Sequence, residues 1–314
     1  MSDLSQKTNN MSNMQAQDDF NRARTKALLS QMQHFMNTDK DKLLSFNDVK
    51  DILKPKNEFY RGMQVVPINL IVGSEGRYRD FNKYFLPRKE HLRHRWERVD
   101  IARIKDVPLP AIQLYEIGGA YFVRDGNHRV SVARTQGVGA LDAEVTSLSS
   151  EIAIKAGMTK DQLKEAVIAF EKQIFYEKTN FGELTGDKDL NFTAPGRYDV
   201  IYNHILVHKY YLNQERSGEI PFPEALVSWY NNVYLPIIKI IRSEWLALNF
   251  PGYSAGDLYV WIVKHWDFLK KKYGIGYSVK DAAKDFSLKY GQTKGVRRFF
   301  AFIGMLIDRL LKKQ

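Results

Sequence analysis

The residues best suited to chemistry lie in one short segment, Tyr121 to Gln136, with the sequence YFVRDGNHRVSVARTQ. An apolar run typical of a strand enters the polar turn Arg124 to Asn127, and helix-forming residues follow until Gly137. A strand that turns sharply into a helix leaves backbone N–H groups free at the helix N-terminus, where the helix dipole also favours an anion. The pattern predicts a phosphate-binding turn.

Several side chains of this turn could assist. Gly126 lets a ligand approach the backbone closely, and Arg129 can hold a phosphate through two parallel hydrogen bonds. Asp125 is too close to the expected phosphate to lack a partner, so it would hold Mg²⁺, orient a donor or accept a proton. We therefore expect Asp125 and His128 to be catalytic. The phosphate-binding residues expected here are Gly126, Asn127, His128, Arg129 and Ser131.

A purely structural interpretation uses the same residues. Asp125 would cap the helix by accepting a hydrogen bond from the backbone amide of His128, and the His128 ring would pack in the core. The sequence leaves both interpretations open.

The motif Asp-Gly-Asn-His-Arg, followed by a helix that contains alanine, resembles the signature turn of the ParB/sulfiredoxin superfamily. In that superfamily the turn binds nucleotide phosphates. The resemblance extends over roughly Gln64 to Thr146, with strand-like runs at Val66 to Ile71, Ile112 to Val123 and Leu141 to Val145. It implies an α+β fold with a small mixed sheet, and a nucleoside di- or triphosphate (ATP, ADP or CTP) bound with Mg²⁺.

Two departures limit what the resemblance implies. The nucleophilic cysteine of the sulfiredoxin turn is replaced by Asn127, and the chain contains no cysteine at all, which excludes sulfinic acid reductase chemistry. The glutamate of the ParB turn is also absent, so specificity for CTP and a DNA clamp do not carry over.

A second candidate phosphate loop follows the first expected strand, Met63 to Ile68. Its residues are Gly73, Ser74, Gly76 and Arg77, whose backbone amides and guanidinium could surround an anion. In ParB-like folds the corresponding loop lies near the signature turn, which is an argument from fold analogy. Glu75 and Asp80 are alternative carboxylates for the same site.

Composition sets wider limits. The 314 residues suffice for about two domains, and 44% hydrophobic residues allow a sizeable core. The net charge of +11 indicates acidic partners: nucleotide, nucleic acid or anionic lipid. The lack of cysteine excludes disulfides and thiolate sites and fits a cytoplasmic protein. No signal peptide and no membrane span are expected.

The hydrophobic pattern divides the chain into four parts. Residues 1–18 are polar and expected to be disordered, and residues 19–62 to form a helical extension. The resemblance implies a nucleotide-binding domain over residues 63–147, and helical periodicity then predicts a helical domain over 148–314. The helix expected in the extension has its apolar positions at Phe20, Ala23, Ala27, Leu28, Met32 and Phe35.

Three further features have competing interpretations. The basic helix Lys89 to Arg103 is either a solvated face or a surface that meets nucleic acid or nucleotide phosphates. His204 and His208 have a zinc-compatible spacing but lack the glutamate of the protease motif, so ordinary histidines are favoured. The apolar segment Gly295 to Lys313, with basic ends, could pack on the helical domain, support a homodimer or lie on a membrane surface.

Two classes of function follow. One is an NTP-dependent enzyme, a hydrolase or a small-molecule kinase, because phosphoryl transfer needs cations and a carboxylate around the phosphates. The other is a nucleotide-gated regulator that binds DNA or a protein, although no helix-turn-helix pattern is visible. A domain that keeps the fold only for scaffolding is the third interpretation.

Overall fold

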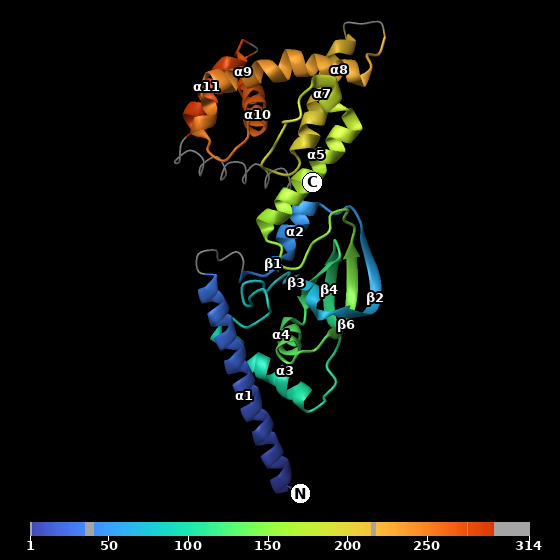
Figure 1. Ribbon diagram of the computed structural model, residues 1–314, viewed down its shortest axis with the longest axis vertical. Helices are drawn as coiled ribbons and strands as arrows, with labels where there is room; N and C mark the ends of the chain where they lie inside the picture. Colours follow the sequence, from blue (N-terminus) through green and yellow to red (C-terminus); the bar gives the residue numbers. More distant parts are fainter. Residues whose placement is uncertain (1, 35–40, 215–217, 275, 292–314) are drawn as a thin grey trace. The chain divides into compact units, whose positions relative to one another are not determined.

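The computed structural model describes residues 2–34, 41–214, 218–274 and 276–291, and it combines helices with one mixed β-sheet (Figure 1). The chain divides into two compact units, Met1–Val167 and Ile168–Gln314. The boundary therefore falls about twenty residues later than the expected boundary at residue 147, because the first turns of the helix Lys160–Thr179 pack on the sheet of the first unit.

Unit 1 contains a six-stranded sheet with the order β1-β3-β5-β4-β6-β2. The pairs β1–β3, β3–β5 and β4–β6 are parallel, and the pairs β4–β5 and β2–β6 are antiparallel. The expected mixed sheet is thus confirmed, but it starts earlier than residue 63, since β1 and the first half of β2 lie in the expected helical extension. The strands are β1 Leu44–Ser45, β2 Glu58–Pro67, β3 Ile71–Ser74, β4 Ile112–Ile117, β5 Ala120–Asp125 and β6 Ala140–Leu148.

Helices cover both faces of this sheet. Adjacent strand residues point to opposite faces, so Val123 joins one core, with α1, α3 and α4, whereas Phe122 joins the other, with α2 and the start of α5. The helices of unit 1 are α1 Ser2–Gln33, α2 Phe46–Leu53, α3 Arg93–Ile104 and α4 Asn127–Thr135, with short 3-10 turns at Ile68–Leu70 and Glu90–Leu92.

The N-terminal segment differs from the expectation. Residues 2–18 are helical rather than disordered, because the buried stripe of Phe20, Ala23 and Ala27 continues one turn upstream to Ala16. Extending an existing helix costs far less than starting one. Leu28 and Met32 were expected on the buried face, yet both are exposed.

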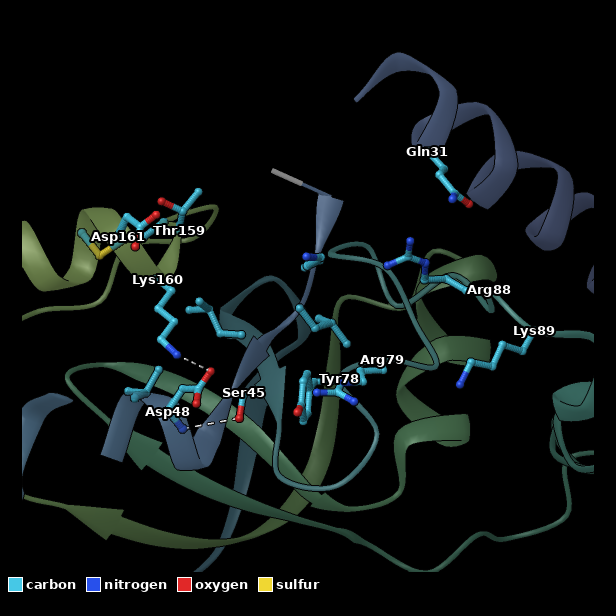
Figure 2. Close-up of a pocket in the computed structure, with 15 residues that line it drawn as sticks. Gln31, Ser45, Asp48, Tyr78, Arg79, Arg88, Lys89, Thr159, Lys160 and Asp161 are labelled. Atoms are coloured by element: carbon cyan, nitrogen blue, oxygen red, sulfur yellow. Dashed lines mark hydrogen bonds and ion pairs between the residues drawn. The ribbon is translucent and has the colours of Figure 1, made fainter. Parts of the chain in front are cut away.

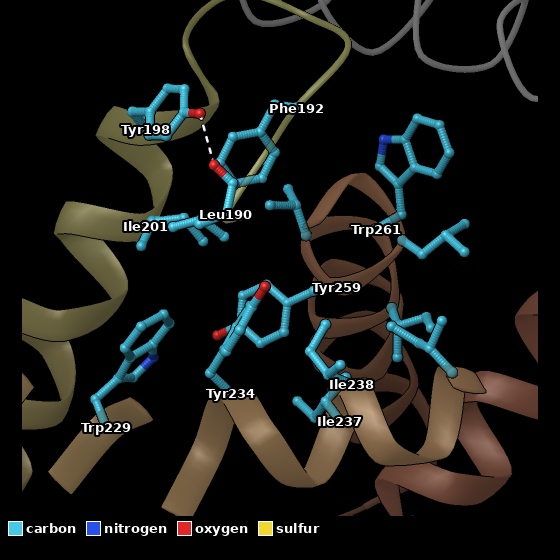
Figure 3. Packing of buried hydrophobic residues seen from close by; sticks show 14 of the residues in the cluster. Leu190, Phe192, Tyr198, Ile201, Trp229, Tyr234, Ile237, Ile238, Tyr259 and Trp261 are labelled. Carbon is cyan, nitrogen blue, oxygen red and sulfur yellow. Dashed lines mark hydrogen bonds between the residues drawn. The ribbon is translucent and has the colours of Figure 1, made fainter. Parts of the chain in front are cut away.

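The described residues of unit 2 form helices and loops without a strand, as the periodicity predicts. Large aromatic side chains fill its core, among them Tyr198, Trp229, Tyr234 and Tyr259 (Figure 3). Pro236 changes the helix geometry through its missing N–H: one π-helical turn, Tyr230–Tyr234, joins α8 to α9. The helices are α5 Lys160–Thr179, which begins in unit 1, α6 Phe181–Thr185, α7 Arg197–Gln214, α8 Phe222–Trp229, α9 Leu235–Ser243, α10 Ala255–Tyr273 and α11 Val279–Tyr290, with a 3-10 turn at Leu246–Asn249.

Two remaining expectations concern membranes and the C-terminus. Among the described helices, none has both the length and the apolar character needed to cross a bilayer. The segment Gly295 to Lys313 lies outside the described residues.

Candidate anion-binding site

The strand-turn-helix unit forms as the sequence predicts. Strand β5 leads to Gly126, and α4 begins at Asn127. Gly126 has φ +105°, and a Cβ there would lie 2.5 Å from the Cγ2 of Ile112, so the turn needs glycine. The first hydrogen bond of the helix runs from the Val130 N–H to the Gly126 carbonyl at 3.0 Å. The three preceding amides, of residues 127–129, therefore lie outside the hydrogen bonding of the helix.

Among the described residues no side chain caps this helix, so Asp125 does not have the capping role that the structural interpretation gives it. The Asp125 carboxylate pairs instead with the Arg129 guanidinium, with 2.5 Å between Oδ2 and Nη2. The N-terminus of α4 is thus left open for a ligand, and its amides and dipole favour an anion.

Arg129 has a different role from the expected phosphate clamp. Its Nη1 donates to the carbonyl oxygen of Ala111 at 2.8 Å and also to that of Pro110. The side chain is only 14% exposed, and its charge is balanced by Asp125. Arg129 therefore fixes the turn to the start of β4 and leaves phosphate contacts to other groups.

His128 is buried and neutral. It is 5% exposed, and its ring stands edge-on to Phe81 with 5.5 Å between the centroids. Burial, followed by the nearby charges of Arg95 and Arg77, lowers the pKa of His128 to about 4. At neutral pH the ring thus offers a neutral N–H donor and adds no positive charge to the site.

Two buried polar atoms beside the open helix end have no hydrogen-bond partner among the described residues: Asn127 Oδ1 and His128 Nδ1. Asn127 is 8% exposed. A buried polar atom without a partner costs about 1–3 kcal/mol, and the great majority of such atoms in proteins are satisfied. Both side chains line a cavity of about 1030 Å³ at the N-terminus of α4, where a polar ligand would satisfy them.

The walls of this cavity are cationic. Arg77 enters from the loop after β3, and Arg95 and Arg98 enter from the basic helix α3. Arg95 and Arg98 are exposed, and no described carboxylate forms an ion pair with either. In total, five arginines line the cavity together with two carboxylates: Arg77, Arg95, Arg98, Arg124 and Arg129, with Asp80 and Asp125.

Arg77 is held in place by Asp80. The Arg77 Nη1 lies 3.1 Å from Asp80 Oδ2, and the Lys89 Nζ lies 2.8 Å from Asp80 Oδ1. Burial opposes ionisation of Asp80, but the hydrogen bonds from Lys89 and Arg77 outweigh it and hold its pKa below the ordinary value. Arg77 can exchange this carboxylate for a ligand phosphate while Lys89 continues to neutralise Asp80.

Three residues that were expected to contact phosphate do not line this cavity. Gly73 belongs to β3, and a Cβ there would lie 2.4 Å from both the Leu44 carbonyl and the Phe122 ring, so close packing explains this glycine. Ser74 is fully buried; its hydroxyl donates to the Val123 carbonyl and accepts from the Arg77 amide. Ser131 is also fully buried and accepts a 2.8 Å hydrogen bond from Trp96 Nε1.

The remaining site residues agree in part with the sequence. Gly76, Arg77 and Asp125 to Arg129 do line one cavity. Arg124 was not singled out, although its place next to Asp125 was a signal. Arg95 and Arg98 were seen only as part of a basic helix, and their i, i+3 spacing places them on one face of it.

The histidine pair that was weighed as a zinc site has ordinary partners. His204 Nδ1 lies 3.2 Å from the Tyr259 hydroxyl, and His208 Nε2 lies 3.0 Å from the Ser228 hydroxyl. Within the described part of the chain, no group of three or more potential metal-ligating side chains occurs.

A comparison with protein-family models finds no match, and comparisons with curated proteins and with solved structures find none either. Any proposal about function must therefore rest on the geometry of the site.

Proposed function

We propose that unit 1 binds the phosphate groups of a nucleoside di- or triphosphate at the N-terminus of α4. The observation that supports this most strongly is the open helix end, where Asn127 and His128 hold buried polar atoms without partners among the described residues, next to an arginine-lined cavity. A phosphate supplies oxygen acceptors for the amides of residues 127–129 and for a protonated His128 Nδ1, and its negative charge suits the arginines. Asn127 Oδ1 is itself an acceptor, so a Mg²⁺ ion or a water that arrives with the nucleotide would satisfy it.

Each group has a distinct part in this proposal. The amides of residues 127–129 donate to the innermost phosphate, and the neutral His128 ring donates from Nδ1. Arg77 joins after leaving Asp80, and Arg95 and Arg98 neutralise the outer phosphates from α3. The resemblance of the turn to ParB-like proteins supports a nucleotide as the carrier of these phosphates: ATP, ADP or CTP.

Turnover is a further part of the proposal. Phosphoryl transfer needs a cation clamp and a carboxylate or base near the transferred group. Asp125 is 57% exposed beside the open helix end, so it could meet a Mg²⁺ ion that arrives with the nucleotide. His128 stays neutral at neutral pH because of its lowered pKa, so it acts as a hydrogen-bond donor to the phosphate and the carboxylate of Asp125 is the candidate base.

Calorimetric titration with ATP, ADP and CTP, each with and without Mg²⁺, tests binding, and phosphate release tests turnover. We expect saturable binding of at least one nucleotide, which inorganic phosphate at high concentration weakens by competition. If none of the three nucleotides binds, the proposed function is wrong. Binding without phosphate release would restrict it to a nucleotide-binding module.

A further inference from the structure

A second cavity, of about 830 Å³, lies in unit 1, and Tyr78 and Arg79 contribute to its lining (Figure 2). Its lining comes from the start of α2, from the segments around Tyr78 and Arg88, and from the first turn of α5. The helices that border it are already capped: Ser45 caps α2, and Thr159 pairs reciprocally with Gln162 at α5. Side chains rather than helix ends therefore determine its chemistry.

The charge of this second cavity matches that of the candidate site. Five cations line it, Lys42, Arg79, Arg88, Lys89 and Lys160, together with the carboxylates Asp48 and Asp161. Lys160 pairs with Asp48 at 2.8 Å. Arg79 and Arg88 form no ion pair with any described carboxylate, so their charge is available to an anionic ligand.

One short loop separates the two cavities. Gly76, Arg77 and Asp80 line the candidate site, whereas the intervening Tyr78 and Arg79 line the second cavity. Asp80 links the two sides, because it binds Arg77 of the first cavity and Lys89 of the second. Arginines that form no ion pair with a described carboxylate therefore line both cavities: Arg95 and Arg98 the first, and Arg79 and Arg88 the second.

We propose that the two cavities together bind a single-stranded oligonucleotide that carries a terminal phosphate. The terminal phosphate occupies the end of α4, and the chain crosses residues 76–80 to reach Arg79 and Arg88. This inference rests on the proposed function for its first contact and extends it from a mononucleotide to a polymer.

Three observations favour this ligand. The polar atoms at the end of α4 are deeply buried, so a chain end reaches them more readily than an internal phosphodiester. A flexible single strand can bend from one cavity to the other around the intervening loop, whereas a stiff duplex cannot. The Arg79 guanidinium lies over the Tyr78 ring, 5.4 Å from its centroid, and a planar cation is a group on which a nucleotide base can stack.

The test compares an eight-nucleotide single strand, with and without a 5′-phosphate, with ATP. Fluorescence anisotropy measures the strand, and calorimetry measures ATP. The variant Arg79→Gln/Arg88→Gln should weaken binding of the phosphorylated strand at least tenfold and leave ATP affinity within twofold. The slope of log K against log salt should fall by about 1.4, since each phosphate contact of a single strand contributes about 0.7.

The matched control is Lys56→Gln/Arg61→Gln, which removes the same charge from exposed residues that line neither cavity. It should leave strand binding within twofold. The inference is overturned if the cavity variant behaves like this control, if the 5′-hydroxyl strand binds equally well, or if a duplex of the same sequence binds as tightly. Normal ATP binding in any of these cases would leave the proposed function standing.

Discussion

Asn127 illustrates the conflict between stability and binding at the scale of one residue. Its buried Oδ1 has no partner among the described residues and lowers the stability of the ligand-free protein. We predict that Asn127→Ala leaves the free energy of unfolding unchanged or raises it by about 1 kcal/mol, while nucleotide affinity falls at least tenfold. Denaturant unfolding and calorimetry measure the two effects.

Asn82 provides the matched control. It is buried, as Asn127 is, but its side-chain oxygen accepts hydrogen bonds from the Tyr84 and Leu86 amides at 3.1 and 3.0 Å. Asn82→Ala should lower the free energy of unfolding by about 1–3 kcal/mol. Equal destabilisation by both substitutions would contradict the special position of Asn127.

His128 predicts a pH dependence of stability. Its pKa is about 4 in the folded protein and near 6.5 in the unfolded chain, so between these values the unfolded chain takes up a proton that the folded protein resists. Stability from this residue is complete above pH 6.5 and falls, by at most about 1.4 kcal/mol per pH unit, as the pH drops toward 4. Arg95, Arg77 and His91 oppose protonation of the ring, and Asp80 favours it.

Asp100 changes stability with pH in the opposite direction to His128 and over the same pH range. The effect of His128 is therefore measured in a variant that lacks the Asp100 carboxylate. Burial, with the charge of Asp19, raises the pKa of Asp100 to about 6, so its contribution to stability is complete below about pH 4 and declines as the pH rises toward 6. In an Asp100→Asn background, we expect the free energy of unfolding, measured by denaturant titration, to fall as the pH drops from 6.5 to 4 because of His128. Substituting His128→Gln there should flatten the profile, and an unchanged profile would contradict the assignment.

At the scale of elements, α4 and α3 contribute arginines with different roles to the site. Arg129 of α4 binds backbone carbonyls, whereas Arg95 of α3 forms no ion pair or side-chain hydrogen bond with the described residues. Arg129→Met should therefore lower the free energy of unfolding by about 2 kcal/mol, and it should weaken binding because the turn is released. Arg95→Met should leave the free energy of unfolding within about 0.5 kcal/mol of the original value and still reduce nucleotide affinity about tenfold. Thermal unfolding measures the effect on stability, and calorimetry measures the effect on affinity. Equal effects of the two substitutions on stability would contradict these separate roles.

The elements also show why only part of the site could be predicted. The turn at Gly126 is local, so strand and helix signals on either side of it were sufficient. The assignment of Gly73 and Ser74 to a loop failed because β3 forms only by pairing with β1 and β5, which are distant in sequence. Ser131 was misjudged for the same reason: its partner, Trp96, comes from another helix.

At the scale of the whole molecule, the candidate site belongs to unit 1 alone. All residues that line it fall between Gly76 and Arg129. A fragment of residues 1–167 should therefore bind nucleotide with an affinity within about threefold of the full chain, since no contact is removed. Calorimetry on both proteins checks this, and loss of binding by a folded fragment would show that unit 2 contributes to the site.

The sequence was sufficient to predict a strand-containing part followed by a helical part, but not the position of the boundary between the two units. The change from strand to helix periodicity near residue 147 is real, since β6 ends at Leu148. However, Leu163 and Val167 of α5 pack in the core of unit 1, and periodicity cannot tell which core a helix face meets.

The central claim is that a phosphate binds the open N-terminus of α4, and amide NMR of ¹⁵N-labelled protein titrated with ADP tests it most directly. We predict that the largest chemical-shift changes occur at the backbone amides of Asn127, His128 and Arg129, with smaller changes at Arg77. Saturable binding that leaves these amides unshifted, or that shifts residues of unit 2 instead, would contradict the account.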